Sequence, residues 1–200
     1  MNNRTTMADV AKLAGVSKMT VSKVIREVGS VSIETRQRVR QAIEDTGYMP
    51  NRIAGSLSTQ TNPMVAVVVP TLSGNTFGEA LRGIEAVLSV AGLQTLVGAT
   101  SYDPETEEKL IENLLSWQPS GLILTSGNEH NDKTRRLLES RPCPIVEIWD
   151  VDDALFDAKV GFSHRNAGQM MAEHLLERGR RNFGFVGSRL HKDLCAAGRY

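Results

Sequence analysis

The chain has 200 residues, 40% of them hydrophobic, and a formal net charge of zero, which suits one or two globular domains. Residues 1–60 hold nine Lys and Arg against five Asp and Glu, and the remainder holds fourteen against eighteen, so a basic module precedes an acidic body and suits a polyanionic partner. Because there is no membrane-length apolar run, no signal-peptide core and no metal-spaced cysteine pair, we expect a cytoplasmic protein with free thiols and with no membrane, metal or other cofactor.

Residues 6–27 predict two short helices joined by a tight turn. Thr6, with Asp9 three residues later, has the N-cap pattern of a first helix, and Gly15 stands where its end needs left-handed backbone. Ser17 caps a second helix, whose apolar residues recur at helical spacing and leave basic and polar side chains on the other faces. This pattern is a helix-turn-helix, and the N-terminal end of its second helix can enter the major groove of DNA.

Lys18 and Met19 open that second helix. A lysine can donate to guanine O6 and N7, and a methionine can pack on a thymine methyl group. We therefore predict that Lys18, Met19 and Lys23 read bases. The residues predicted to contact phosphates are Thr20, Ser22 and Arg26. The alternative is a pair of surface helices whose basic residues are only solvated.

A third helix is predicted over residues 33–46, capped by Ser32 and ended by Gly47. With the first two helices it closes a small core, which we expect to contain Val10, Val21, Val24, Val39, Ile43 and Tyr48. Residues 50–58 then predict a short helix that is too short to be stable alone. Its alternative is a plain linker with an exposed leucine.

From residue 63 the pattern changes to buried strands that alternate with helices, which predicts a parallel doubly wound α/β sheet. The predicted strands cover residues 65–69, 93–99, 121–125, 144–148, 160–162 and 183–186. The predicted helices cover residues 76–91, 104–117, 132–140 and 166–178. The first of these helices is expected to bury Phe77, Leu81, Ile84, Leu88 and Ala91.

The ends of the predicted strands carry small polar groups, one carboxylate and several aromatic residues, and no phosphate-binding glycine motif. Ligands of such sheets bind at the carboxyl ends of the strands. Polar groups there can bond the hydroxyls of a small polyol or sugar acid, and aromatic faces can cover its C–H faces. The candidate residues are Leu72, Ser73, Asn75, Phe77, Ser126, Asp150 and Phe162. The alternative is ordinary loop chemistry.

Two segments, ADVAKLAGVSKMTVSKVI and VSIETRQRVRQAIEDTGYMPNRIAGSL, resemble the headpiece of the lactose/purine repressor family over residues 6–58. KMTVS, LLSWQPSGLILT and VGFSHRNAG are most similar to the gluconate-operon repressor branch. The resemblance implies an all-α helix-turn-helix headpiece (1–49), a hinge helix and linker (50–62), and an effector-binding domain (63–200). This last domain resembles a periplasmic sugar-binding protein, with one lobe to about residue 161 and an incomplete second lobe over 162–200.

In that family the hinge helix forms when two copies pair on a near-palindromic operator, and Leu57 matches the leucine that wedges into the minor groove. The DNA-binding residues implied are Thr6, Ser17, Lys18, Met19, Thr20, Ser22, Lys23, Arg26, Asn51, Arg52, Ala54 and Leu57. Most family members have Arg where Lys23 stands, and lysine lacks the guanidinium fork, so we expect weaker guanine discrimination there. In the effector site the resemblance adds Arg199, whose guanidinium would suit the carboxylate of an effector such as gluconate.

We therefore predict a homodimeric, nucleoid-associated repressor of sugar or sugar-acid genes, controlled by a small effector. Because family members continue beyond residue 200, a truncated regulator that binds DNA without sensing an effector is the alternative. An enzyme is disfavoured, because the sequence has no nucleophile elbow or metal triad, its four histidines are scattered, and no residue is predicted to be catalytic. A transport-type binding protein is disfavoured by the helix-turn-helix.

Overall fold

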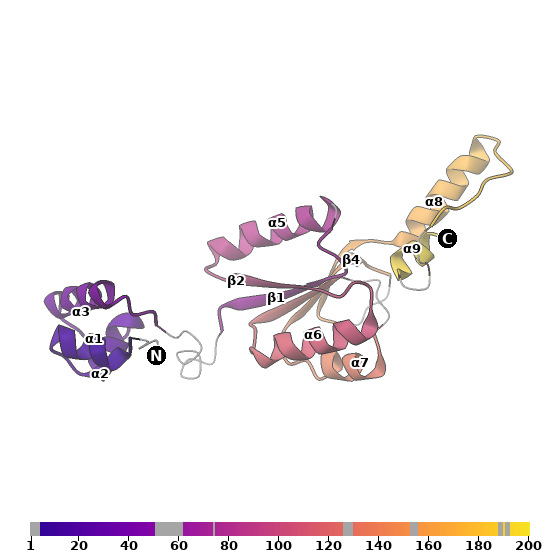
Figure 1. Cartoon of the computed structure of the whole chain (residues 1–200). Coiled ribbons are helices and arrows are strands. Elements are labelled where there is room, and N and C mark those ends of the chain that lie inside the picture. The colour runs from indigo at the N-terminus through magenta and orange to yellow at the C-terminus, as the bar shows by residue number, and fades with distance from the viewer. Residues whose placement is uncertain are drawn as a thin grey trace. The chain divides into compact units, whose positions relative to one another are not determined.

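The computed structural model of the chain describes residues 5–50, 62–73, 75–125, 130–152, 156–187, 190 and 193–200. The chain divides into two compact units, residues 1–60 and 61–200. Each unit is considered by itself (Figure 1). The first consists of helices, and the second contains a parallel sheet with helices on both faces.

The first unit contains α1 (Met7–Ala14), α2 (Lys18–Ile25) and α3 (Ile33–Thr46). The predicted caps are present, because the Thr6 backbone N–H donates to the Asp9 carboxylate at 2.9 Å and the Thr20 N–H donates to Ser17 Oγ at 3.1 Å. Gly15 ends α1 in the left-handed conformation, with φ of 65°. The buried core of this unit is Val10, Ala11, Ala14, Val21, Val24, Val39 and Ala42. Ile43 and Tyr48 pack against it, as the spacing predicted.

Ser17→Ala is expected to loosen α2, because the Thr20 N–H loses the side-chain acceptor that satisfies it at the helix start. N-cap removal costs about 1 kcal/mol, so amide hydrogen exchange of residues 18–25 should be about fivefold faster. Exchange is measured by mass spectrometry on the intact chain. Ser30→Ala, in the exposed loop before α3, is the control and should leave the exchange of α2 unchanged. Equal rates in the two variants would contradict the cap.

The second unit is built on a five-stranded parallel sheet with the order β2-β1-β3-β4-β5. The strands are β1 (Met64–Val69), β2 (Gln94–Ala99), β3 (Gly121–Thr125), β4 (Ile145–Asp150) and β5 (Ala158–Phe162). Since all five run the same way, their carboxyl ends meet at one edge of the sheet. The predicted fold class is confirmed, and each of the first five predicted strands is present within a few residues.

Helices cover both faces of this sheet, α5 (Asn75–Val90) on one face and α6 (Pro104–Ser116) with α7 (Asp132–Glu139) on the other (Figure 1). The buried core lies on the α6 and α7 side and consists of Ala66, Val68, Ile111, Leu114, Leu122, Leu124, Leu138 and Ile145. The predicted burial of the α5 face is only partly correct. Phe77, Leu81, Ile84 and Leu88 are half-buried and Ala91 is exposed. The reason is that α5 is the single described helix on this face of the sheet, so no neighbouring helix covers the sides of its apolar face (Figure 1).

The chain beyond β5 contains α8 (His164–Glu177) and α9 (Leu194–Arg199). The strand predicted over residues 183–186 is wrong. These residues are irregular, and Phe183, Phe185 and Val186 are 50%, 40% and 100% exposed. The apolar alternation was typical of a strand, but no described strand lies beside this segment to pair with its backbone. Helix α9 was not predicted, since its six residues are too few for a clear helical period.

Candidate DNA-binding surface and effector site

The second helix of the first unit places its two faces as the sequence predicted. Val21 and Val24 are buried in the core, at 0% and 3% exposure, and fix the rotation of α2. Lys18 is exposed and Met19 is 69% exposed at the N-terminal end of the helix. Two of the three side chains predicted to read bases, Lys18 and Met19, are therefore exposed at the end of α2 that can enter a groove.

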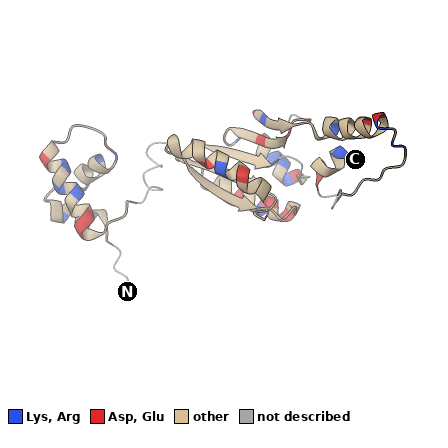
Figure 2. Cartoon of the chain, turned by 90° about the horizontal axis from the view of Figure 1, so that it is seen from above, with Lys and Arg blue, Asp and Glu red and all other residues tan. Residues whose placement is uncertain are grey.

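The other predicted DNA contacts of this unit lie at the start of α1, along α2 and at its C-terminal end. Thr6, Ser17 and Arg26 are exposed, and Thr20 and Ser22 are half-buried. Lys23 is also half-buried, and its Cδ lies 3.5 Å from the position that a Cβ on Gly29 would take, so its stem packs along the turn after α2. This packing gives Lys23 less freedom to reach a base edge than Lys18 has. Figure 2 shows Lys and Arg positions on the helices of this unit.

Four predicted DNA contacts and one predicted effector contact lie outside the described residues. They are Asn51, Arg52, Ala54, Leu57 and Ser126.

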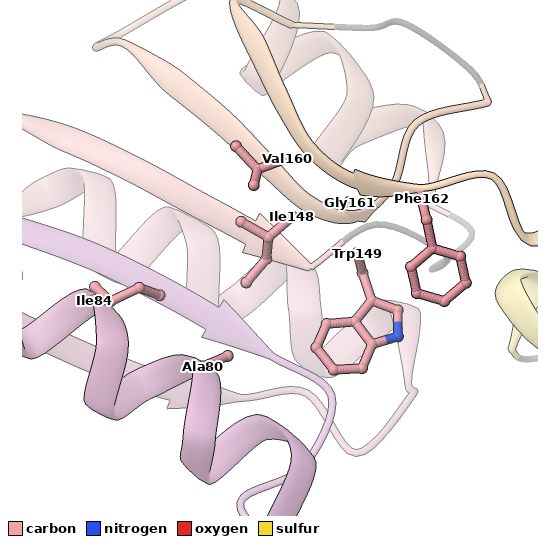
Figure 3. Close-up of a pocket in the computed structure, with 7 residues that line it drawn as sticks. All are labelled: Ala80, Ile84, Ile148, Trp149, Val160, Gly161 and Phe162. Carbon is pink, nitrogen blue, oxygen red and sulfur yellow. The ribbon is translucent and has the colours of Figure 1, made fainter.

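In the second unit, aromatic side chains gather at the carboxyl edge of the sheet. The Phe77 ring, at the start of α5, lies 5.0 Å from the Trp149 ring, which comes from the end of β4. Trp149 and Phe162, at the end of β5, line a pocket of about 310 Å³ whose opposite wall is α5 (Figure 3). Its lining is Ala80, Ile84, Ile148, Trp149, Val160, Gly161 and Phe162. The pocket therefore has an apolar wall suited to the C–H face of a ligand.

Three predicted residues from the first strand end, Leu72, Ser73 and Asn75, are exposed. The Ser73 N–H donates to Thr71 Oγ1 at 3.0 Å, which shapes the turn between β1 and α5. None of the three lines the apolar pocket. The structure thus brings Phe77 to the aromatic group and leaves its three neighbours at the rim of the sheet.

The backbone at Trp149 is strained, with φ of 102°, a conformation that bulky residues rarely adopt. Its neighbour in register on β5 is Gly161. A Cβ on Gly161 would lie 2.5 Å from both the carbonyl carbon and the oxygen of Trp149. The absence of a side chain at Gly161 therefore lets the Trp149 backbone turn out of the regular strand, and this turn sets the direction of the indole.

Three of the predicted effector residues come together around His164, which the sequence reasoning missed. Asp150 pairs in register with Phe162. The Phe162 ring lies 4.4 Å from the His164 imidazole, and Arg199 Nη1 lies 2.5 Å from His164 Nδ1. The signal for His164 was its place in VGFSH, where Ser163 caps a helix directly after a strand end. Sequence alone did not separate it from the exposed His174.

His164 is the only described histidine that is fully buried, at 1% exposure. Burial, with the nearby Arg199 guanidinium as the second cause, lowers the pKa of His164, although the carboxylates of Asp150, Asp193 and Asp152 act in the opposite direction. The imidazole is therefore neutral at neutral pH. Since a guanidinium can only donate, Nδ1 must accept from Arg199, which leaves the proton on Nε2.

The first turn of α8 is already capped. The Asn166 N–H donates to Ser163 Oγ at 2.9 Å, and the Arg165 N–H donates to Asp152 Oδ2 at 3.2 Å. The hydrogen bond from the Ser163 hydroxyl lowers the pKa of Asp152, so this carboxylate stays ionised. These two hydrogen bonds hold the first turn of α8, and with it His164, in position.

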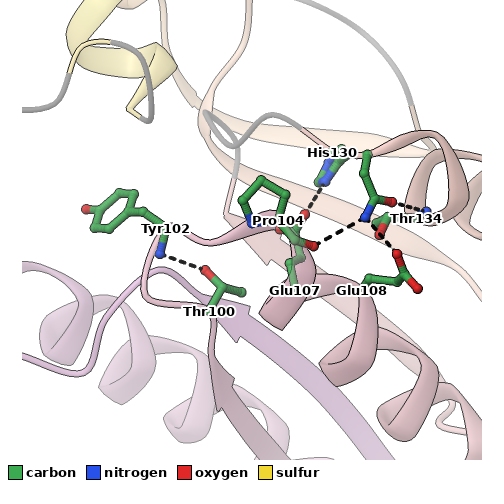
Figure 4. Close-up of polar contacts among 8 residues, drawn as sticks. Thr100, Tyr102, Pro104, Glu107, Glu108, His130 and Thr134 are labelled. Carbon is green, nitrogen blue, oxygen red and sulfur yellow. Dashed lines mark hydrogen bonds and ion pairs between the residues drawn. The ribbon is translucent and has the colours of Figure 1, made fainter.

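A second polar cluster joins α6 to α7, on the face of the sheet opposite to α5 (Figure 4). His130 Nδ1 lies 2.7 Å from Glu107 Oε2, and both side chains are nearly buried. The Asn131 amide donates to Glu108 Oε2 at 2.7 Å, and Lys133 Nζ donates to the other oxygen of Glu108 at 2.6 Å. These bonds tie the start of α7 to the first turns of α6, which is a structural role.

Neither Cys143 nor Cys195 forms a disulfide within the part of the chain that the structure describes, and Cys195 is 4% exposed. Burial raises the pKa of Cys195 to about 12 and also raises the pKa of Cys143. Among the described residues there is no group of three or more side chains that could hold a metal ion, and no helix there is long and apolar enough to span a membrane.

Comparison with known families gives both units a match. Residues 6–51 match the model of bacterial regulatory proteins of the lacI family, and residues 62–192 match that of periplasmic binding proteins and the sugar binding domain of the LacI family. The chain belongs to the LacI family. The resemblance that the headpiece motifs indicated is thereby confirmed over both units.

Known LacI-family proteins match along nearly the whole chain. The HTH-type transcriptional regulator GntR of Pseudomonas aeruginosa is 43% identical over 94% of this chain and 54% of its own length. A crystal structure of a LacI-family transcriptional regulator from Silicibacter pomeroyi has a TM-score of 0.89 and 46% identity, covering 98% of this chain and 58% of that one. The Lac repressor dimer bound to operator has a TM-score of 0.78 and 26% identity, covering 98% and 59%. The chain thus spans little more than half the length of these relatives.

Proposed function

We propose that this LacI-family chain is a sequence-specific DNA-binding transcriptional regulator, a repressor whose operator affinity is set by a small sugar or sugar acid. The observation that carries the proposal is the presentation of α2. Two buried valines lock the helix to its core, and Lys18 and Met19 stand exposed at the end that a major groove admits. The likeness to a repressor dimer bound to operator supports a homodimer on a near-palindromic site.

The chemistry of the sheet edge supports a sugar acid as the effector. Phe162 and Trp149 offer aromatic faces, Asp150 is an acceptor for ligand hydroxyls, and Arg199 with His164 supplies donors suited to a carboxylate. The resemblance to the gluconate-operon branch, to which relatives with the name GntR add support, makes D-gluconate the first ligand to test.

The protein would act by binding and not by catalysis, in the cytoplasm and on the nucleoid. Its buried thiol stays protonated, and its buried histidine is neutral and hydrogen-bonded to an arginine rather than to a nucleophile. The thiol and the histidine therefore do not form the pair of a nucleophile and a general base that covalent catalysis requires.

The test is selection of duplexes from a random DNA pool by the purified chain at low ionic strength. We expect enrichment of a near-palindromic sequence, because two copies related by a two-fold axis would present two identical recognition helices. Binding to it should weaken steeply as salt rises, since phosphate contacts release counterions. Enrichment of no sequence, with binding unaffected by salt, would contradict the proposal. Enrichment of a site combined with no response to any sugar acid would favour the alternative of a regulator without effector sensing.

A further inference from the structure

His164 Nε2 is a buried polar atom without a hydrogen-bond partner among the residues that the structure describes. Two other buried side chains there have such an atom, Thr134 Oγ1 in α7 and Glu147 Oε2 inside β4. Glu147 Oε2 still lies 3.5 Å from the Lys159 ammonium and belongs to the middle of β4, and Thr134 lies in α7, which covers the face of the sheet opposite to α5 (Figure 1). His164 alone among the three lies beside the predicted effector residues.

The chemical state of this nitrogen follows from its neighbour. Arg199 donates to Nδ1, so the neutral ring carries its proton on Nε2, on the side of the ring that faces away from the guanidinium. The Nε2–H group is therefore a hydrogen-bond donor for which no described residue supplies an acceptor. A buried donor without an acceptor destabilises the protein, and a ligand oxygen that accepts from it recovers this loss on binding.

The surroundings indicate which kind of acceptor fits. The Phe162 ring, which lines the apolar pocket, lies against the His164 ring at 4.4 Å. Asp150, the register partner of Phe162, favours ligand groups that donate, whereas His164 and Arg199 favour groups that accept. A ligand with hydroxyls along its chain and a carboxylate at one end has both kinds of group.

We propose that His164 Nε2–H is a specificity-determining donor to a carboxylate oxygen of the effector, and that Arg199 is a positioning residue that fixes the required tautomer. This inference rests on the effector part of the proposed function and deepens it. It changes the expected role of Arg199 from direct contact with the ligand to control of the histidine that contacts it.

Two substitutions separate the two ring nitrogens. The amide nitrogen of His164→Gln reaches the place of Nε2 and keeps a donor there. The shorter side chain of His164→Asn reaches only the place of Nδ1, where its oxygen can accept from Arg199. Isothermal titration of the intact chain with D-gluconate should show affinity within about threefold of wild type for His164→Gln and about tenfold weaker or more for His164→Asn, the usual effect of one hydrogen bond to a charged group. D-glucitol, which has the same carbon chain and no carboxylate, is the control ligand. Its affinities for the two variants should differ far less than those of D-gluconate do.

The reverse order, with His164→Asn like wild type and His164→Gln impaired, would mean that the ring serves only to hold Arg199 and would overturn the proposal. Nitrogen-15 NMR of histidine-labelled wild type gives a second measurement that needs no variant to fold. We expect the Nε2–H tautomer in the free protein and a shifted, slower-exchanging Nε2 proton with D-gluconate. A Nδ1–H tautomer, or no change at saturation, would overturn it. If wild type binds neither ligand, both this inference and the proposal of a sugar-acid effector are rejected. The proposal of a DNA-binding regulator is tested separately, by the selection of duplexes.

Discussion

Lys18→Ala is expected to weaken binding to the selected duplex about tenfold while leaving binding to random DNA nearly unchanged, because a lysine that donates to a guanine edge contributes to one sequence only. Arg26→Ala should weaken both and lower the salt dependence by about one unit of log–log slope, as loss of one phosphate contact does. Both side chains are exposed at opposite ends of α2, so neither change disturbs the core of the first unit.

The measurement is fluorescence anisotropy with both duplexes over a range of salt concentrations. Lys12→Ala removes the same charge from the exposed last turn of α1 and is the matched control. It should change both affinities little and equally. Equal losses on the two duplexes for Lys18→Ala would reject the role of this residue in reading a base.

Gly161→Ala is expected to destabilise the second unit by about 1–3 kcal/mol, the usual cost of forcing an extra methyl group into a filled space. The new Cβ would meet backbone atoms of Trp149 at 2.5 Å, and backbone cannot turn aside as a flexible side chain can. The strands β4 and β5 would have to separate or Trp149 would have to change its φ, so we also expect loss of measurable D-gluconate binding. DNA binding by the first unit should survive at temperatures where the second unit stays folded.

Thermal unfolding followed by Trp fluorescence, together with titration calorimetry, checks this result. Gly121→Ala is the matched control, because Gly121 is also a strand glycine of the same sheet and its added Cβ would lie 3.6 Å from the nearest atom, an ordinary contact. If Gly161→Ala proves as stable as Gly121→Ala and binds D-gluconate like wild type, the bend at Trp149 does not depend on the missing side chain.

How far the sequence predicts the molecule depends on the range of the interactions. Capping pairs such as Ser17 with Thr20 span three residues, and the helical spacing of Val21 and Val24 spans one turn, so local pattern defined the first unit and its exposed helix end. In the second unit, apolar runs located the paired strands but failed at 183–186. A strand requires a neighbour for its backbone groups, and apolar alternation alone does not supply one.

The sequence by itself determined the family, the two units, the caps and the faces of the first two helices, and the polar and aromatic character of the strand ends. Only the tertiary structure decided that Asp150, Phe162 and Arg199 gather around His164, that Arg199 bonds its Nδ1, and that Gly161 lets Trp149 take its strained turn. The reason is physical. The pairings of Asp150 with Phe162 and of Trp149 with Gly161 join residues 12 positions apart, and the bond from Arg199 to His164 joins residues 35 positions apart. These contacts form only once the parallel sheet has brought its strand ends to one edge.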